Sequence, residues 1–358
     1  MPVHKPALAI CGGGNAGHAL AVATSRNFEG DIFWLVGSEE KADVLRRGIS
    51  SDGGLYSTGV IAGKADKVVA VSSDPKAVIP SADIVMIAVP AFAHAAILKQ
   101  IDPFVKDGAL VGSLPTRSGF EFEATQLLSG IEPEGTRILF GLQTLPWSTR
   151  VQQAGKVVNF GALKAKVLMA TLPEWHASDL AGVLSQILGT EIVPTKNFLN
   201  MTLGNPGQVI HPGLMYGFFA AWGGETYNED GIPLFYAQAS DETGAFIERL
   251  SGEIVSVARA VEVRSEGAID LSGVLPIHDW LKISYPTQTA DTSTIAACFR
   301  TGPLQARKAP MIEGAPGSFA PNFAYRYLSE DVPFGLAVVR AIAQMANVQT
   351  PAIDAVLH

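Results

Sequence analysis

The chain has 358 residues, 47% hydrophobic and 17% charged, a balance that predicts a folded protein of about two domains rather than a disordered chain. The 34 acidic and 26 basic side chains leave a formal charge of −8, which argues against nucleic acid or an anionic membrane as a partner. Two distant cysteines, Cys11 and Cys298, provide neither a disulfide framework nor the spacing of a metal site. Because the amino terminus lacks signal-peptide features, we expect a reducing, cytoplasmic setting.

Residues 1–197 alternate apolar strand patterns with helical patterns. Strands are expected at residues 7–11, 31–36, 67–71, 82–89, 109–114 and 137–142. Helices are expected at 15–26, 39–47 and 92–101, and a surface loop or small hairpin at 48–64. Continuous apolar strands that alternate with helices predict an α/β domain with a doubly wound parallel sheet, covered by helices on both faces.

Residues 198–358 show a different pattern, with long helical periodicities at 198–221, 241–261 and 332–346, and predict a mainly α-helical second domain. The longest segment without Asp, Glu, Lys or Arg covers residues 197–224. It contains Asn200, Asn205, Gln208 and His211, a polar content that a lipid-facing helix does not tolerate. We therefore expect a buried helix, or a helix and a turn, and no membrane span.

A glycine-rich turn follows the first expected strand and opens the first expected helix. Gly12, Gly14 and Gly17 fit the pattern G-x-G-x-x-G, in which the first glycine permits a tight turn, the second a close approach of a pyrophosphate, and the third close helix–strand packing. The free N–H groups of the helix then face the phosphates. In this context the motif predicts a Rossmann domain that binds a dinucleotide. We expect the cofactor to contact Gly12, Gly14, Asn15, Ala16, Gly17, Ser38, Val89, Pro90 and Ala91.

The choice between NAD and NADP depends on the end of the second strand. A carboxylate there binds the ribose of NAD, but in this chain Gly37 and Ser38 occupy the tip and Glu39 comes two residues later. No arginine stands at the tip to bind a 2′-phosphate, although Arg46 and Arg47 follow on the next helix. NAD (as NADH) is favoured, and NADP stays open.

The fourth expected strand ends in the sequence VPAFAH, beside the expected position of the nicotinamide. Pro90 and Ala91 are expected to shape that wall. His94 is a possible catalytic residue, but we interpret it as a helix-start residue that faces solvent or the cofactor.

Three residues of the second half could act in acid–base chemistry and carboxylate binding. His211 is the ionisable side chain of an otherwise uncharged stretch, which fits either a satisfied core histidine or a proton donor for reduction of a C=N or C=O bond. Asp331 either starts a helix or orients His211, and Arg326 is either a surface charge or a bidentate carboxylate ligand. Sequence alone does not pair residues 120 positions apart.

The chain resembles the opine dehydrogenases, most closely the invertebrate octopine dehydrogenase-like group. The resemblance runs nearly end to end. It is carried by the blocks CGGGNAGHA, SADIVMIAVPAFAHAAI, DGALVGSLPTRSGFEFE, FGLQTLPW, the IHP around His211, PLFY, the pair Asp279-Trp280, and RYLSEDVPFG.

This resemblance implies an activity and assigns roles to residues. Members condense an α-keto acid, usually pyruvate, with the amino group of an amino acid and reduce the imine with NADH. The family's catalytic histidine–aspartate pair matches His211 and Asp331, and its substrate-carboxylate arginine matches Arg326. Trp280 matches a tryptophan that lines the amino-acid site, and Asn205 an asparagine seen in several members.

Two departures from the octopine group affect the expected substrate and the extent of the chain. Arg117 stands where octopine dehydrogenase has a neutral glutamine near the amino-acid substrate. An added positive charge disfavours a guanidinium, so we expect Arg117 to favour a small donor such as alanine, glycine, β-alanine or taurine; the alternative is that Arg117 faces phosphate or solvent. The octopine group also continues beyond residues 351–358, so the natural protein is either short or longer than this chain.

Two rival functions remain open at this point. One is a reductase of the same superfamily shape, such as ketopantoate reductase or glycerol-3-phosphate dehydrogenase, which uses a lysine as proton donor. The other is a non-catalytic dinucleotide-sensing protein. Partners are expected to be the small-molecule substrates alone, and many relatives of the octopine type act as monomers, which favours a monomer.

Overall fold

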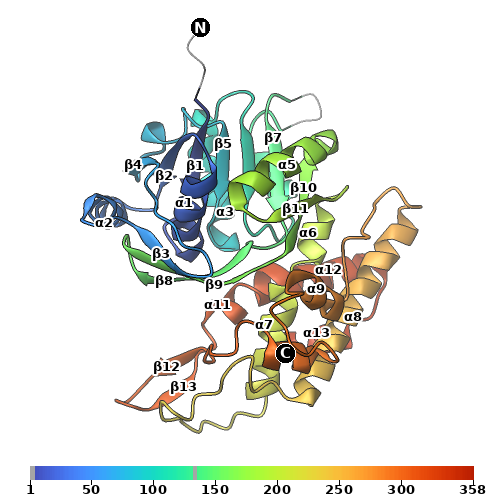
Figure 1. Ribbon diagram of the computed structural model, residues 1–358. Helices are drawn as coiled ribbons and strands as arrows, with labels where there is room; N and C mark the ends of the chain where they lie inside the picture. Colours follow the sequence, from blue (N-terminus) through green and yellow to red (C-terminus); the bar gives the residue numbers. More distant parts are fainter. Residues whose placement is uncertain (1–4, 132–134) are drawn as a thin grey trace. The chain divides into compact units, whose positions relative to one another are not determined.

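The computed structural model describes residues 5–131 and 135–358, which form two compact units, Met1–Met201 and Thr202–His358 (Figure 1). The sequence placed the division after residue 197. The division falls within the short helix α6 (Leu199–Leu203).

The first unit is built on an eight-stranded sheet in the order β11-β10-β7-β6-β5-β1-β2-β4. Six neighbouring strands, from β7 to β4, are parallel and correspond to the six that the sequence predicted. β10 pairs antiparallel with β7, and β11 runs parallel to β10, so the complete sheet is mixed. The strands are β1 (Ala7–Cys11), β2 (Asp31–Leu35), β4 (Val68–Ser72), β5 (Ile84–Ile87), β6 (Leu110–Ser113), β7 (Ile138–Leu142), β10 (Lys166–Leu172) and β11 (Glu191–Pro194).

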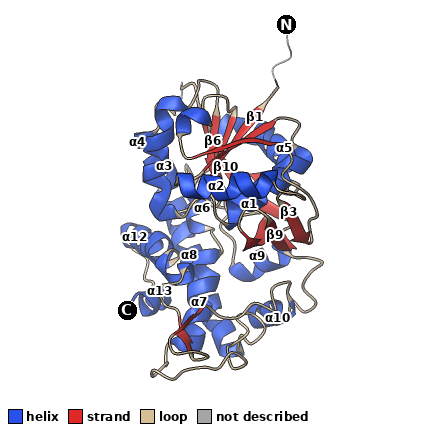
Figure 2. Ribbon diagram, turned by 90° about the vertical axis from the view of Figure 1, so that its left-hand side faces the viewer, coloured by secondary structure: helices blue, strands red, loops and turns tan. Residues whose placement is uncertain are grey.

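Helices cover both faces of this sheet, as the doubly wound prediction requires. Alternate residues of each central strand point to opposite faces, so Leu8 and Ile10 belong to one core and Ala9 and Cys11 to the other. The first core is covered by α1 (Asn15–Asn27), α2 (Glu39–Ser50) and α5 (Ala177–Leu188), and the second by α3 (His94–Ile101) and α4 (Phe120–Leu127). Figure 2 shows α3 and α4 on the side of the sheet opposite to α5.

A second, three-stranded sheet corrects the expectation for residues 48–64. Instead of only a surface loop or local hairpin, this segment contributes β3 (Tyr56–Gly59), which pairs in parallel with β9 (Val157–Leu163) about 100 positions later. β9 also forms an antiparallel hairpin with β8 (Trp147–Gln153). The sequence analysis missed β3, β8, β9, β10 and β11.

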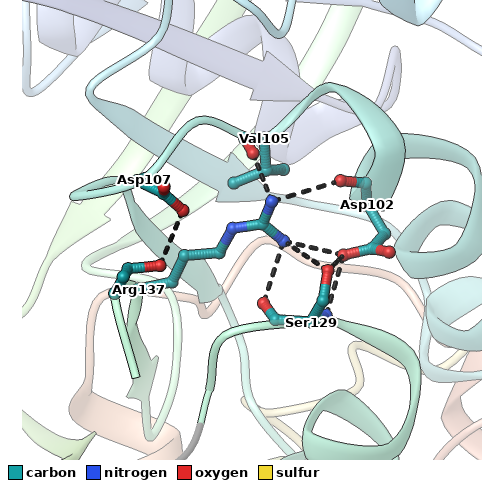
Figure 3. Close-up of polar contacts among 6 residues, drawn as sticks. Asp102, Val105, Asp107, Ser129 and Arg137 are labelled. Carbon is teal, nitrogen blue, oxygen red and sulfur yellow. Dashed lines mark hydrogen bonds and ion pairs between the residues drawn. The ribbon is translucent and has the colours of Figure 1, made fainter. Parts of the chain in front are cut away.

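The amino-terminal ends of β6 and β7 are tied by a buried arginine (Figure 3). Arg137 precedes β7, and its Nη1 donates to Asp102 Oδ1 at 2.7 Å and to the Ser129 carbonyl at 2.9 Å. Its Nη2 donates to the Val105 carbonyl, and Thr136 Oγ1 donates to Asp107 Oδ1 at 2.7 Å. These contacts hold three connecting segments together at the edge away from the glycine-rich turn, so we interpret the cluster as structural.

The second unit is mainly helical, as predicted. The expected helix at 198–221 is broken, because Gly204, Asn205 and Pro206 separate α6 from α7. The remaining elements are α7 (Gly207–Phe219), α8 (Asp241–Arg264), α9 (Ile277–Ser284), α10 (Ile295–Thr301), β12 (Met311–Glu313), β13 (Phe319–Pro321), α11 (Arg326–Ser329), the π-helical turn η5 (Val332–Leu336), α12 (Ala337–Ala346) and α13 (Pro351–Leu357). Over the described residues, none of the helices combines the length and the apolar character needed to cross a membrane.

Candidate active site

The carboxyl ends of four neighbouring parallel strands form one edge of the first unit. The strand order β2-β1-β5-β6 brings Ser38, the glycine-rich turn, the segment 89–91 and the loop that contains Arg117 to that edge. The chain proceeds from β1 outward through β2 to β4, and then in the opposite direction from β5 through β6 to β7. Such a switch point is where doubly wound sheets bind their ligands.

The glycine-rich turn is so tightly built that side chains are excluded at two of its three glycines. At Gly12 (φ +127°) an added Cβ would lie 2.4 Å from the Ala88 carbonyl oxygen, and at Gly17 it would lie 1.9 Å from the Gly12 carbonyl oxygen. At Gly14, the N-cap of α1, an added Cβ would meet nothing within 4 Å. The turn thus combines open space with an uncapped helix N-terminus, which fits a pyrophosphate.

Two buried side chains that the sequence analysis missed hold this turn in place. Trp34 Nε1 donates to the Gly12 carbonyl at 2.8 Å. His18 Nε2 accepts the Gly155 N–H at 2.9 Å, so its Nδ1 carries the proton and donates to the Gly14 carbonyl at 2.9 Å. Burial lowers the pKa of His18, which favours this neutral form. The one available signal was the spacing of His18 four residues after Gly14, on one helix face.

Asn15 and Ser38, both expected at the cofactor, have their side chains engaged within the first unit. Asn15 Oδ1 accepts the Val151 N–H at 2.8 Å. Ser38 Oγ accepts the Lys41 N–H at 3.3 Å and caps α2. Of the other expected cofactor residues, Ala16 and Val89 are half-buried, Pro90 is exposed and Ala91 is buried.

Glu39, two residues beyond the expected carboxylate position, is held in place as an anion. Arg46 and Ser73 donate hydrogen bonds to it, and these contacts, led by Arg46, lower the pKa of the Glu39 carboxyl. Arg46 also bonds Asp43 and the Val71 carbonyl. These contacts occupy the guanidinium that was considered for a 2′-phosphate.

α3 begins at His94, as expected for a helix-start residue, but the structure contradicts the alternative in which its side chain faces solvent. Its side chain is 2% exposed, it lies edge-on to Phe120, and Ser113 Oγ lies 3.3 Å from its Nε2. Burial and the nearby charge of Arg117 lower the pKa of His94 to about 4. A neutral, packed imidazole at this position is a core residue because Ser113 of β6 and Phe120 of α4 pack against it.

Arg117 itself is 5% exposed, so it is not turned to solvent. It lies in the loop between β6 and α4, four residues before Glu121. Burial raises the pKa of the Glu121 carboxyl to about 7.

In the second unit, the break before α7 determines where His211 lies. Asn205 Oδ1 accepts the Gly207 N–H at 2.9 Å and starts the helix. Gln208 Nε2 donates to the carbonyls of Thr202 and Leu203, both at 3.0 Å, and so joins α7 to the end of α6. His211 follows one turn into α7. The side chain of Asn205, an expected substrate ligand, is thus used to build the helix that carries His211.

His211 and Asp331 are brought together from positions 120 residues apart. His211 Nδ1 lies 2.7 Å from Asp331 Oδ2, and the Asp331 side chain is 3% exposed. Asp331 stands at the N-cap of η5, but its carboxylate bonds the imidazole and makes no cap hydrogen bond. The carboxylate therefore contacts the imidazole instead of capping the following turn. With the Nδ1 proton directed to the carboxylate, any proton exchange of this imidazole with a substrate would have to use Nε2.

The helix α11, directly before Asp331, contributes further side chains. Arg326 is half-exposed, and its Nη2 lies 3.0 Å from Oε2 of the buried Glu330, one turn later. The ring of Tyr327 stacks on His211 with 3.8 Å between centroids. Trp280 is buried in α9, with its ring edge-on to Tyr285. The sequence analysis missed Tyr327 and Glu330, although the spacing of Arg326 and Glu330 is typical of a helical ion pair.

Comparisons with known proteins identify the family of the chain. A family model described as NAD/NADP octopine/nopaline dehydrogenase, alpha-helical domain, matches residues 194–358. One described as NAD-dependent glycerol-3-phosphate dehydrogenase N-terminus matches residues 7–137. An opine dehydrogenase from Haliotis discus hannai is 30% identical over 366 residues, which cover 99% of this chain and 89% of the relative. A tauropine dehydrogenase from Arabella iricolor is 32% identical over 365 residues, covering 98% and 89%. This chain belongs to the opine dehydrogenase family.

Solved structures agree with this assignment. The structure of an octopine dehydrogenase with NADH and L-arginine matches this opine dehydrogenase with a TM-score of 0.81 and 25% identity, over 99% of this chain and 88% of that one. A ketopantoate reductase, with a TM-score of 0.62 and 14% identity, shares the fold. The protein is an NAD-dependent oxidoreductase with a Rossmann domain and a helical opine dehydrogenase domain, which overturns the non-catalytic alternative.

Proposed function

We propose that this opine dehydrogenase condenses pyruvate, or a closely related α-keto acid, with the amino group of a small amino acid and reduces the resulting imine with NADH. The observation that carries the proposal is the hydrogen bond of 2.7 Å between His211 and the buried Asp331, within the domain that characterises the family. In this proposal, unit 1 binds the dinucleotide and unit 2 contributes the acid–base and carboxylate-binding groups.

The reaction joins an amine to a keto carbon, releases water and adds a hydride to the C=N carbon, for which NADH supplies the hydride. His211, protonated, donates a proton from Nε2 to the carbonyl oxygen as the amine adds. Asp331 keeps the imidazole in the correct orientation and stabilises its charged form. Arg326, held by Glu330 and half-exposed, binds the keto-acid carboxylate through its remaining N–H groups. Trp280 is proposed to line the amino-acid site.

The cofactor is bound by the glycine-rich turn and the neighbouring strand ends in this proposal. Backbone N–H groups at residues 14–17 take the pyrophosphate. The segment 89–91 contacts the nicotinamide half, and the loop at Ser38 and Glu39 contacts the adenosine ribose. The fixed anion of Glu39 supports NADH over NADPH, because it repels a 2′-phosphate.

The proposed amine donor is small and has an uncharged side chain, such as alanine, glycine, β-alanine or taurine. The support is the positive charge of Arg117, which is buried and close enough to His94 to lower its pKa. A buried cation attracts an anionic head group and repels a guanidinium. A tauropine dehydrogenase at 32% identity is compatible with this preference.

A screen of NADH oxidation with pyruvate against arginine, alanine, glycine, β-alanine and taurine tests the proposal. We expect oxidation with at least one small donor and a lower kcat/KM with arginine. Arg117→Gln should narrow the difference in kcat/KM between the small donor and arginine. Arg150→Gln is the matched control, because Arg150 is an exposed residue of a strand. Arginine as the best donor would refute the specificity, and no oxidation with any donor would refute the reaction.

A further inference from the structure

The ring of Tyr327 lies face to face with the imidazole of His211. The two ring centroids are 3.8 Å apart and the planes differ by 12°. Tyr327 is 6% exposed, on the short helix α11 that leads directly to Asp331. The histidine is therefore contacted both through its Nδ1, by Asp331, and across its ring face, by Tyr327.

The ring of Tyr327 is itself anchored at its edge and on its face. Arg307 Nη1 donates to the Tyr327 hydroxyl at 3.4 Å, and Tyr236 forms a further hydrogen bond with that hydroxyl. Phe235 stacks on Tyr327 with 5.2 Å between centroids, and Tyr325 lies edge-on to it at 4.9 Å. Because the hydroxyl is bonded and neighbouring rings pack around it, Tyr327 cannot pivot without breaking these contacts.

We propose that Tyr327 is a positioning residue for His211. This proposal rests on the proposed role of His211 as the proton donor. One hydrogen bond at Nδ1 leaves the imidazole able to tilt about that bond, and the stacked face of Tyr327 removes this freedom. The parallel arrangement also brings the ring quadrupole of Tyr327 under the imidazole, where it stabilises the imidazolium more than the neutral ring. Tyr327 thus acts both on the direction of Nε2 and on the protonation of His211.

The other charged and titratable groups near His211 lie on the elements that pack against α7. Asp331 is the N-cap of η5, Arg326 is the first residue of α11, and Glu330 is its C-cap. Arg307 reaches the site through Tyr327. On its other side, α7 meets α8 through small and apolar contacts, as where Gly213 approaches Ile247. α13 contributes Asp354, which pairs with Arg340. Asp331 and Tyr327 are therefore the groups whose removal should change the titration of His211 most directly.

The test compares Tyr327→Leu, which removes the stacked face, with Tyr327→Phe, which keeps the face and removes the hydroxyl. The first readout is the titration of the His211 imidazole by NMR in the free protein. We expect Tyr327→Leu to move its midpoint to lower pH by roughly 0.5–1 unit, the loss of a cation–π contact of partly buried type. Tyr327→Phe should titrate close to the wild type. Tyr216→Leu is the matched control. Tyr216 lies on α7, as His211 does, but it stacks on Phe246 of α8, with 4.4 Å between centroids.

The second readout is the pH profile of kcat/KM for imine reduction. Because the reaction uses protonated His211, kcat/KM should fall at high pH. Tyr327→Leu should move this fall to lower pH, whereas Tyr327→Phe should keep the wild-type profile. An unshifted His211 titration in Tyr327→Leu, with only a lower melting temperature, would reduce Tyr327 to core packing and overturn the inference. If the NMR shift occurs but His211→Asn retains turnover, the stacking is upheld and the proposed function fails.

Discussion

The glycine-rich turn of unit 1 and the His211 centre of unit 2 are built in opposite ways. The turn uses backbone groups of six consecutive positions, residues 12–17, and its closest contacts would be violated by a single Cβ. The His211 centre uses side chains from residues 205–331, and its geometry depends on hydrogen bonds and ring stacking between separate helices. The turn is tightly packed because its glycines have no Cβ atoms. The His211 centre is held by contacts between side chains.

This difference predicts different failures on substitution. At the turn, a substitution should reduce cofactor binding or stability. At the His211 centre, a substitution should reduce turnover while the fold and cofactor binding persist.

The largest effect is expected for Asp331→Asn. The substitution removes the carboxylate that orients His211 and stabilises its charged form, so kcat/KM for NADH oxidation with pyruvate and an amine should fall by roughly 10²–10⁴-fold. NADH affinity, measured by fluorescence titration, should remain that of the wild type. The matched control is Asp354→Asn, which breaks the half-exposed pair with Arg340 in the same unit. A variant that loses NADH affinity as strongly as turnover would contradict the proposed division of roles.

Two glycines of the turn should separate stability from cofactor binding. Gly17→Ala places a Cβ 1.9 Å from the Gly12 carbonyl oxygen, so it should lower the free energy of unfolding by about 1–3 kcal/mol and abolish tight NADH binding. Gly14→Ala meets nothing within 4 Å, so it should leave the melting temperature unchanged and still weaken NADH binding. Unchanged NADH affinity in Gly14→Ala would argue that the phosphates do not approach this position. Gly182→Ala, in an equally open helical position, serves as the control.

His94 should make the stability of the protein depend on pH. Its folded pKa of about 4 lies below the unfolded value of 6.5. As pH falls from about 6.5 to 4, His94 binds a proton in the unfolded state but stays neutral in the folded state. The free energy of unfolding therefore falls by up to about 3 kcal/mol.

The measurement is the difference in unfolding free energy between wild type and His94→Gln across this pH range. The difference isolates His94 from Glu121, whose raised pKa of about 7 stabilises the fold below about 4.5 and loses that contribution as pH rises to 7. Parallel pH dependences in the two proteins would show that His94 is not held neutral by burial.

The smallest effect is expected for His18→Gln. The imidazole links the Gly14 carbonyl to the Gly155 N–H, so its loss should loosen the turn and weaken NADH binding by roughly tenfold, the cost of about one hydrogen bond. Turnover at saturating NADH should change little, in contrast to Asp331→Asn. His278→Gln is the control, because His278 is a half-buried histidine bonded to the Thr292 carbonyl in the other unit. An unchanged dissociation constant for NADH would show that Trp34 and the helix alone hold the turn.

Much of unit 1 was predictable because its signals are local. Each of the six parallel strands is an apolar run of four or five residues bounded by turn residues. Gly12 and Gly14 lie directly between β1 and α1, and Gly17 lies in the first turn of α1. Two of the missed strands, β3 and β8, have weaker local signals, whereas β10 is an apolar run like the predicted strands. Strand β8 contains Ser148, Arg150 and Gln152, which are half-buried or exposed, and β3 pairs with β9 across about 100 residues. Pairing of that kind is decided by register and by the packing of one face, which no short window records.

Neighbouring residues of RYLSEDVP show the same limit within the site. Asp331 and Arg326 were singled out because their chemistry suits the reaction, whereas nothing in the sequence singled out Tyr327. Its stacking on His211 depends on how α11 packs on α7, and its anchoring depends on Arg307 and Tyr236 from other segments. His94 was assigned a solvent- or cofactor-facing position because the sequence does not show which residues pack against it. In the structure Phe120 and Ser113 bury it.

By itself, the sequence determined the parallel core of the sheet, the phosphate-binding turn and the helical character of the second half, because each depends on residues within one or two elements. Only the tertiary structure decided that His211 Nδ1 meets Asp331 Oδ2 at 2.7 Å, that Glu330 holds Arg326, and that Tyr327 lies on the imidazole. The physical reason is that side-chain chemistry is encoded residue by residue, whereas distance and orientation between helices arise from packing of the whole unit.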